Sequence, residues 1–312
     1  NEGARLIACL DSLRPVAGPV VYVDSGSTDG SPAAAEQRGA SVLRLDLATP
    51  FTAARARNAG LAELAARDQP PAYVQFIDGD CELQPEWIAT ASAFLDAHPE
   101  AAVAFGRRRE RSPNASVYNR LCDREWNVPV GQAKACGGDA LMRLSALTAA
   151  GGYRESLIAG EEPELCLRLR AAGWEVWRLD AEMTLHDAAI LRFGQWWRRT
   201  RRAGHAFAEG AALHGAPPER HWVRESRRCL LWGLALPASV LVAATATPWA
   251  WLILLAYPLQ VARLALRNGV ATRAGWETAL FATIGKTPEA FGAVEYALGR
   301  VLNRRRRLIE YK

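Results

Sequence analysis

Carboxylates follow two apolar runs of this sequence, at points where strands are expected to end. Asp78 and Asp80 flank a glycine directly after the run at 73–77, and Asp24 follows the run at 19–23. The glycine lets both carboxylates of the pair point the same way from a tight turn, and hard oxygen ligands suit Mg²⁺ or Mn²⁺ bound to substrate phosphates. Turns after strands are also rich in Asp and Gly for conformational reasons alone. The pattern is therefore compatible with a metal site and with an ordinary turn.

Other candidate groups also have two interpretations each. Glu161 and Glu162 begin an expected helix, where the helix dipole stabilises carboxylates, but a carboxylate there also suits a general base that deprotonates a hydroxyl. His186, beside Asp187, is either a metal ligand or a surface histidine. Ser27 either holds the edge of a nucleotide or caps the helix that follows it.

Arginines gather in two places where they could contact phosphate. Arg198 and Arg199 follow two tryptophans on an expected helix, so they could clamp a diphosphate or lie at a membrane interface, where Trp and Arg are both enriched. The arginines at 107–109 are interpreted as a solvated stretch, with binding of an acceptor phosphate as the alternative.

The elements that must position these residues alternate in type along the first two hundred residues. Strands are expected at 19–23, 41–46, 73–77, 101–105 and 175–179, and helices at 33–38, 53–66, 87–97, 145–150, 162–172 and 195–209. This alternation predicts an α/β fold built on a parallel sheet. Ligands of open α/β sheets bind at the carboxyl ends of the strands, where Asp24 and Asp78 are expected.

The second half of the chain contains an uncharged apolar stretch. No charged residue occurs from 229 to 262, and arginines stand on both sides of this run. A single straight helix of this length would measure roughly 50 Å, against a hydrocarbon core of about 30 Å. The Thr-Ala-Thr-Pro run at 245–248 offers a break, so we expect a two-pass membrane hairpin at about 229–266 with both ends on the cytoplasmic side. The alternatives are a re-entrant or interfacial hairpin and a buried pair of core helices in a soluble protein.

The charge of the chain is modest and unevenly placed. There are 38 Lys+Arg and 33 Asp+Glu, which gives a net charge of +5. The arginines flank the apolar run, and those at 304–307 suit an anionic leaflet, so membrane lipids are the expected partner and no nucleic acid is. The six cysteines form no Cys-x-x-Cys pair, which predicts reduced thiols in the cytosol without a zinc site or disulfide framework.

Seven short motifs occur in a definite order over approximately residues 1–205. They are Asn1-Glu2, Asp24 with Ser-x-Ser-Thr-Asp-Gly, Arg55-Ala-Arg57-Asn58-Ala-Gly60, Asp78-Gly-Asp80, Gly137-Gly138-Asp139, Gly160-Glu161-Glu162 and His186. In these motifs the chain resembles the family 2 inverting glycosyltransferases. The resemblance implies a GT-A fold, which is a Rossmann-like nucleotide-diphospho-sugar transferase domain, with a nucleotide-sugar donor and a divalent metal, Mn²⁺ or Mg²⁺.

The resemblance also implies roles for individual residues. The donor-binding set is Glu2, Asp24, Ser27, Arg57, Asp78, Gly138, Arg198 and Arg199, with Glu2 and Asp24 on the nucleoside. Asp80 and His186 would bind the metal. Glu162 would deprotonate the acceptor hydroxyl in a single in-line displacement, in which the metal and nearby arginines stabilise the departing diphosphate.

The chain departs from the family pattern in four places. An apolar strand usually precedes Asn1-Glu2, so we expect that the chain is cut from something longer. The base is usually Asp, whereas Glu162 reaches one methylene farther, with Glu161 beside it. Asp139 stands where a neutral residue is usual, which makes it a second candidate base. The processive signature is incomplete at 195–199, because arginine stands where tryptophan is usual, and this favours the addition of a single sugar.

Together these features predict a GT-A glycosyltransferase domain at 1–205 and a helical membrane-associated region at 206–312. The predicted reaction transfers a sugar from a nucleotide-diphosphate sugar to a membrane-proximal acceptor, a lipid-linked glycan of a bacterial envelope or exopolysaccharide pathway. The catalytic domain would face the cytoplasm at the inner membrane. The alternatives are a nucleotidyltransferase and a membrane-docked nucleotide-sugar-binding protein with a degenerate site.

Overall fold

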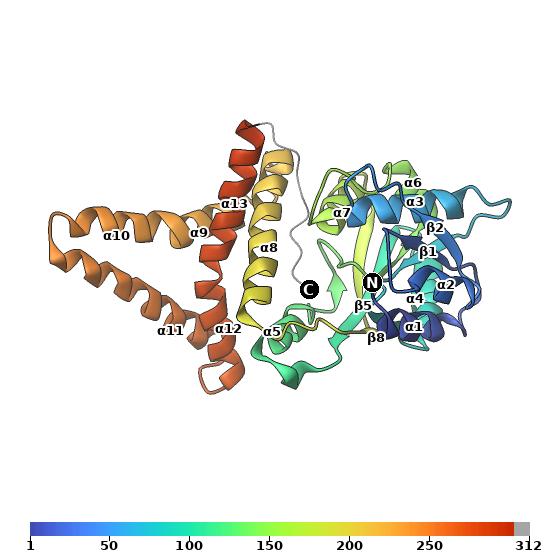
Figure 1. Cartoon of the computed structure of the whole chain (residues 1–312), viewed down its shortest axis with the longest axis horizontal. Coiled ribbons are helices and arrows are strands. Elements are labelled where there is room, and N and C mark those ends of the chain that lie inside the picture. Colours follow the sequence, from blue (N-terminus) through green and yellow to red (C-terminus); the bar gives the residue numbers. More distant parts are fainter. Residues whose placement is uncertain (303–312) are drawn as a thin grey trace. The chain divides into compact units, whose positions relative to one another are not determined.

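The computed structural model describes residues 1–302, and its backbone separates into two compact units (Figure 1). The first unit comprises residues 1–115 and 122–189, and the second comprises 116–121 and the chain from 190 onward. The predicted domain boundary at 205 therefore falls inside the second unit, within helix α8 (Phe193–His214). Helix α5 (Val117–Glu125) is divided between the units, because its first residues belong to the second and its last residues to the first.

The first unit contains two sheets. Strand β1 (Val21–Asp24) pairs in parallel with β2 (Ser41–Arg44). The larger sheet has the order β3-β7-β5-β8-β4, with β6 also on β8. Its strands are β3 (Tyr73–Phe76), β4 (Cys81–Leu83), β5 (Ala101–Glu110), β6 (Gly131–Gln132), β7 (Ala140–Arg143) and β8 (Glu175–His186).

The α/β class is confirmed, but the prediction of a parallel sheet is wrong for the larger sheet. Within it only β5 and β8 run parallel, and the other pairings are antiparallel. The short strands β4 and β7 cause the difference. Strand β4 pairs with β8, and β7 pairs with β3 and β5, all from distant parts of the sequence. Both strands have too few residues to give a recognisable period of two.

Helices cover these sheets and close an apolar core. They are α1 (Ala4–Leu13), α2 (Ser31–Glu36), α3 (Ala53–Ala65), α4 (Trp87–Ala97), α6 (Leu144–Ala149) and α7 (Glu161–Ala171). Trp87, Leu95 and Val103 are fully buried, as are Met142 and Leu165. Each such side chain contributes about 1.5–3 kcal/mol relative to exposure in water. The core therefore fixes the strand ends from which the polar residues project.

An apolar cavity of about 560 Å³ also lies in the first unit. Leu6 of α1, Val21 of β1, Leu61 of α3 and Val74 of β3 are among the residues that line it. Strands β1 and β3 belong to different sheets, and each is an edge strand among the described residues. The expectation of a further strand before Asn1 stays a prediction.

The second unit is helical. Besides α8 it contains α9 (Val223–Leu230), α10 (Leu236–Ala244), α11 (Ala256–Asn268), α12 (Arg273–Ile284) and α13 (Lys286–Val301). Helices α8 and α13 lie side by side (Figure 1). A Cβ atom on Gly204 would lie within 1.9 Å of the carbonyl oxygen of Glu289, and one on Gly292 within 1.9 Å of the carbonyl oxygen of Arg201. These two glycines therefore permit the close approach of the helices.

Two helical arms form the expected apolar hairpin. One arm is continuous over Val223–Ala244 through a π-helical turn at Leu231–Ala235, and the other covers Pro248–Asn268 and begins with a 3-10 helix at Pro248–Leu255. Both are long and apolar enough to cross a membrane, and most of their residues are exposed. The break before Pro248 is confirmed, and the depth of insertion stays a prediction. The arginines at 304–307 lie outside the described residues.

Candidate active site

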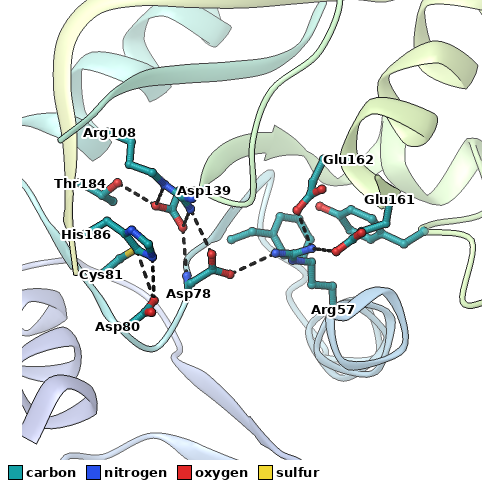
Figure 2. Close-up of polar contacts among 12 residues, drawn as sticks. Arg57, Asp78, Asp80, Cys81, Arg108, Asp139, Glu161, Glu162, Thr184 and His186 are labelled. Carbon is teal, nitrogen blue, oxygen red and sulfur yellow. Dashed lines mark hydrogen bonds and ion pairs between the residues drawn. The ribbon is translucent and has the colours of Figure 1, made fainter. Parts of the chain in front are cut away.

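Asp78, which follows β3, lies between two arginines from different elements (Figure 2). Arg57 of α3 places Nη2 3.1 Å from Oδ1 of Asp78, and Arg108 of β5 places Nη2 3.1 Å from Oδ2. The side chains of the arginines are 13% and 14% exposed, whereas Asp78 is 38% exposed. Charge-assisted pairs in such partly buried positions are stronger than surface pairs. The two arginines therefore hold each carboxylate oxygen from its own side.

The first turn of α7 brings two glutamates to Arg57. Nη1 of Arg57 lies 2.9 Å from Oε1 of Glu161 and 2.7 Å from Oε1 of Glu162. Burial, and then the charge of Glu161, raise the pKa of Glu162 from 4.5 to about 7, although Arg57 opposes this shift. A carboxylate with a pKa near neutrality is a better proton acceptor than an ordinary glutamate, which is what a general base requires.

Asp139 is held in a different way, because its carboxylate accepts three hydrogen bonds and also pairs with Nη2 of Arg108. Oδ1 accepts from the backbone N–H of Asp78 at 3.0 Å and faces Nη2 of Arg108 at 2.8 Å. Oδ2 accepts from Nε of Arg108 at 2.9 Å and from the Thr184 hydroxyl at 2.7 Å. A carboxylate has about four acceptor positions, so these donors fill them. The side chain is fully buried.

Asp80, two residues beyond Asp78, lies beside His186. Oδ1 of Asp80 lies 3.3 Å from Nε2 of His186, and both side chains are 7% exposed. Burial, and then the positive charge of Arg108, lower the pKa of His186 to about 4, so the imidazole is neutral near pH 7. Nδ1 of His186 is buried without a hydrogen-bond partner.

These residues fit a divalent metal. Ligand atoms of Asp78, Asp80, Cys81 and His186 lie within 4.8 Å of one another. A carboxylate with a neutral imidazole is a usual donor set for ions such as Mn²⁺. Burial, and then the charge of Asp139, raise the pKa of the Cys81 thiol well above its usual range. Hard ions such as Mn²⁺ and Mg²⁺ also prefer carboxylate oxygen to sulfur.

Asp24 lies at the end of β1, as the sequence predicts, and is 5% exposed. Its carboxylate accepts hydrogen bonds from the backbone N–H groups of Gly26 at 3.0 Å and Ser27 at 3.2 Å. Burial opposes ionisation, but the hydrogen bonds from Ser27 and Gly26 outweigh it and lower the pKa of Asp24. The loop therefore presents a fixed, charged carboxylate.

Two further predicted residues lie at the Asp78 turn. A Cβ atom on Gly138 would come within 2.9 Å of both Nη2 of Arg57 and Oδ2 of Asp78, so the loop lies directly against the ion pairs. Glu2 is close to Gly79, since a Cβ atom there would lie 3.8 Å from Cγ of Glu2. Arg198 and Arg199 belong to α8 of the second unit, and their donor role stays a prediction.

Sequence reasoning missed Arg108 and Thr184, and the interpretation of 107–109 as solvated is wrong for two of its three residues. Arg107 is 5% exposed and Arg108 lies in the ionic cluster, whereas the Arg109 side chain is 54% exposed. The alternation of a strand places residue 108 on the opposite face from its neighbours. The sequence would have shown this alternation if the strand predicted at 101–105 had been continued to Glu110.

Residues 1–146 match the family model described as "Glycosyl transferase family 2". The succinoglycan biosynthesis protein ExoA of Rhizobium meliloti (strain 1021) is 31% identical over 232 residues, which cover 69% of this chain and 70% of that relative. The chain belongs to glycosyl transferase family 2. The prediction of a glycosyltransferase is therefore confirmed.

Solved structures share the fold of this family 2 enzyme at low sequence identity. One is the mannosyltransferase PcManGT from Pyrobaculum calidifontis in complex with GDP-Man and Mn²⁺, with 20% identity, a TM-score of 0.60, and coverage of 95% of this chain and 84% of that one. Another is S. aureus TarS 1–349 in complex with UDP-GlcNAc, with 15% identity, a TM-score of 0.50, and coverage of 97% and 89%. The expectation of a GT-A fold is confirmed.

Proposed function

We propose that this glycosyltransferase moves a sugar from a nucleoside diphosphate donor to an acceptor hydroxyl with inversion, and that Glu162 is the base. The observation that carries the proposal is the position of Glu162, which is partly buried beside Glu161, has a pKa of about 7 and contacts the arginine that holds Asp78. One base is sufficient for a single displacement, and no covalent nucleophile is needed.

In this reaction Glu162 accepts the proton of the acceptor hydroxyl while that oxygen attacks the anomeric carbon. The bond from that carbon to the diphosphate oxygen breaks, and the electron pair leaves with the nucleoside diphosphate. Asp24 and Asp78 hold the nucleoside, with Glu2 and Ser27 beside them, and Gly138 leaves room for the donor. Arg57 and Arg108 add positive charge where negative charge develops on the leaving group.

Asp80 and His186 would hold the divalent metal, Mn²⁺ or Mg²⁺. When bound, such a metal neutralises the charge of a departing diphosphate. Asp139, the second candidate base, is better suited to positioning, because its acceptor positions are filled by Arg108, Thr184 and the N–H of Asp78. It fixes Arg108 and the Asp78 turn.

The acceptor is proposed to lie at a membrane. The two apolar arms of the second unit support membrane attachment, and the name of the relative ExoA refers to succinoglycan biosynthesis. A lipid-linked glycan in a bacterial exopolysaccharide or envelope pathway would meet both observations, with the first unit on the cytoplasmic side of the inner membrane. Arg198 and Arg199 would then contact the diphosphate or the lipid interface.

The test is a panel of UDP-, GDP- and dTDP-sugars offered to the full chain in detergent, with Mn²⁺ or with EDTA. We expect one nucleoside diphosphate to be released in a metal-dependent way, and Glu162→Gln to bind the same donor without turning it over. Failure to bind or turn over any donor with metal present would overturn the proposal and favour a scaffold with a degenerate site.

A further inference from the structure

The last turn of α5 is held against β5 by Asp123. Oδ1 of Asp123 accepts hydrogen bonds from Nη2 of Arg107 at 2.8 Å and from the backbone N–H of Glu110 at 3.0 Å. The backbone N–H of Trp126, directly after α5, donates to the carbonyl oxygen of Cys122 at 3.0 Å, which continues the helical pattern. The backbone of Trp126 is therefore fixed relative to the sheet that carries the candidate site.

The Trp126 side chain contacts two residues of the candidate site. Its ring centroid lies 4.7 Å from that of His186, and the two rings are nearly perpendicular, at 80°. The guanidinium carbon of Arg108 lies over the Trp126 ring, 5.4 Å from its centroid. Perpendicular aromatic pairs and guanidinium groups over an indole are both favourable contacts. One half-buried indole therefore joins a candidate metal ligand to an arginine that holds Asp78.

His186 lacks the hydrogen bond that usually orients a metal-binding histidine. Such a histidine binds the metal through one ring nitrogen, and its other ring N–H normally donates to a carboxylate, a carbonyl or water. Nε2 of His186 lies 3.3 Å from Oδ1 of Asp80, whereas Nδ1 is buried and no described protein group pairs with it. A metal on Nε2 would also replace the contact of that atom with Asp80. The perpendicular contact with Trp126 is therefore well placed to fix the plane of the imidazole.

We propose that Trp126 is a positioning residue for the metal site, and that its ring holds the His186 imidazole in the orientation that presents Nε2 to the ion. This role rests on the metal site proposed at Asp80 and His186. Arg108 in turn supports the Trp126 ring, because its guanidinium group is held by the carboxylates of Asp78 and Asp139. A cluster of ion pairs thus orients a metal ligand through an aromatic side chain that does not itself contact the ion.

An aromatic ring suits this task better than an aliphatic side chain does. A flat ring restricts the rotation of a perpendicular imidazole and also attracts the Arg108 cation, whereas leucine would fill part of the volume without either effect. Phenylalanine would keep a ring beside the imidazole. Trp126 is half-buried and lies outside the main apolar core of the unit, so its replacement can be tested in a folded protein.

The test measures the Mn²⁺ affinity of the full chain in detergent from the electron paramagnetic resonance signal of the ion. We expect Trp126→Leu to weaken binding about tenfold, because the His186 ligand is no longer held in its binding orientation. Trp126→Phe should stay within about threefold of the wild type, because an aromatic ring remains beside the imidazole. Trp177→Leu is the matched control and should leave the affinity unchanged. It removes a half-buried tryptophan that also lies against a histidine, His98 at 6.2 Å, which is not among the candidate ligands.

A second measurement detects the His186 ring directly and needs no metal. The chain has five histidines, so a protein labelled with carbon-13 in its histidine rings gives few nuclear magnetic resonance signals, and His186→Asn identifies the signal of interest. An indole ring shifts the resonances of a ring that lies against it, because its circulating π electrons alter the local magnetic field. With EDTA present, Trp126→Leu should therefore move the His186 resonance, and Trp177→Leu should move that of His98 instead.

Binding of Mn²⁺ to Trp126→Leu at the wild-type affinity would overturn the proposal, and so would an unchanged His186 resonance in that variant. Equal losses of affinity in the two leucine variants would also overturn it, because they would indicate a general loss of stability. A wild type that binds no Mn²⁺ would overturn the metal site together with this role. Equally tight binding by the wild type and Trp126→Leu would overturn the role of Trp126 alone and leave the proposed metal site standing.

Discussion

The two sides of the Asp78 carboxylate have the same kind of ion pair but different surroundings. On one side Arg108 pairs with Asp139, whose oxygens accept three hydrogen bonds and whose side chain is fully buried. On the other side one nitrogen of Arg57 is shared by Glu161 and Glu162, and the pKa of Glu162 is about 7. The Asp139 carboxylate, whose acceptor positions are all filled, is fixed in place. The Glu162 carboxylate shares Nη1 of Arg57 with Glu161 and is therefore available to take a proton.

The largest predicted effect is that of substituting Glu162. We expect Glu162→Gln to lower kcat by about 10³-fold, because the proton of the acceptor hydroxyl loses its acceptor, while donor binding changes little. Glu161→Gln is the matched control and should stay within about tenfold of the wild-type kcat. Steady-state transfer rates and donor dissociation constants measure both. Equal losses in the two variants would remove the distinction between the glutamates.

A second prediction concerns the candidate metal site at Asp80 and His186. Asp80→Asn should weaken Mn²⁺ binding by about a hundredfold, because a charged oxygen ligand is replaced by a neutral one. Titration with Mn²⁺, followed by its electron paramagnetic resonance signal, measures the affinity. Asp139→Asn is the comparison, and its Mn²⁺ affinity should stay within about tenfold of the wild type. Unchanged affinity in Asp80→Asn would contradict the assignment of the ligand.

At Asp139 the expected effect is on stability. Asp139→Asn leaves Arg108 without its buried partner, which costs about 3–5 kcal/mol, or a fall in Tm of roughly 10 °C. Thermal unfolding in detergent measures this difference. Glu162→Gln should not lower Tm at pH 8, because at that pH Glu162 is ionised and its charge, which burial and Glu161 disfavour, destabilises the fold. If Asp139→Asn unfolds at the wild-type temperature, the contacts of the Asp139 carboxylate do not hold the site.

The smallest predicted effect is on pH dependence. The base form of Glu162 falls below its pKa of about 7, so kcat/KM should rise about tenfold per pH unit up to that value and then level off. Stability changes in the opposite direction to activity, because the folded protein binds the Glu162 proton more tightly than the unfolded chain does. The stabilisation that protonated Glu162 provides is therefore lost as pH rises from 4.5 to about 7. Glu162→Gln should lose both dependences. A flat profile in the wild type would contradict the raised pKa.

The sequence predicts the positions of the candidate site residues better than it predicts the sheet around them. Asp24 and Asp78 were expected at strand ends, and they lie there because apolar runs before a polar loop are a local signal. The antiparallel strand β7 was missed because its pairing with β3 and β5 is decided by contacts distant in sequence.

Two features of the site also lay beyond the sequence. Asp139 was a candidate base because it stands where the family usually has a neutral residue. The contacts that fix its carboxylate come from Asp78, Arg108 and Thr184, which are far away along the chain. The arginines at 107–109 form one charged run, but the pleat of β5 sends neighbouring side chains to opposite faces. Burial by the rest of the fold then decides which of them becomes an ion-pair partner.

The division of helix α5 between the two units has a consequence for dissecting the protein. Residues 116–121 interrupt the first unit in the sequence and belong to the second unit, where they form their contacts. The Ser116 hydroxyl donates to the carbonyl oxygen of Ile190 at 2.6 Å, Asn119 accepts from the N–H of Ile190 at 3.1 Å, and Arg120 pairs with Glu277 at 2.8 Å. A single cut after Ala189 would therefore strip this segment of its partners. A soluble catalytic fragment requires a second change, in which these six residues are redesigned for water.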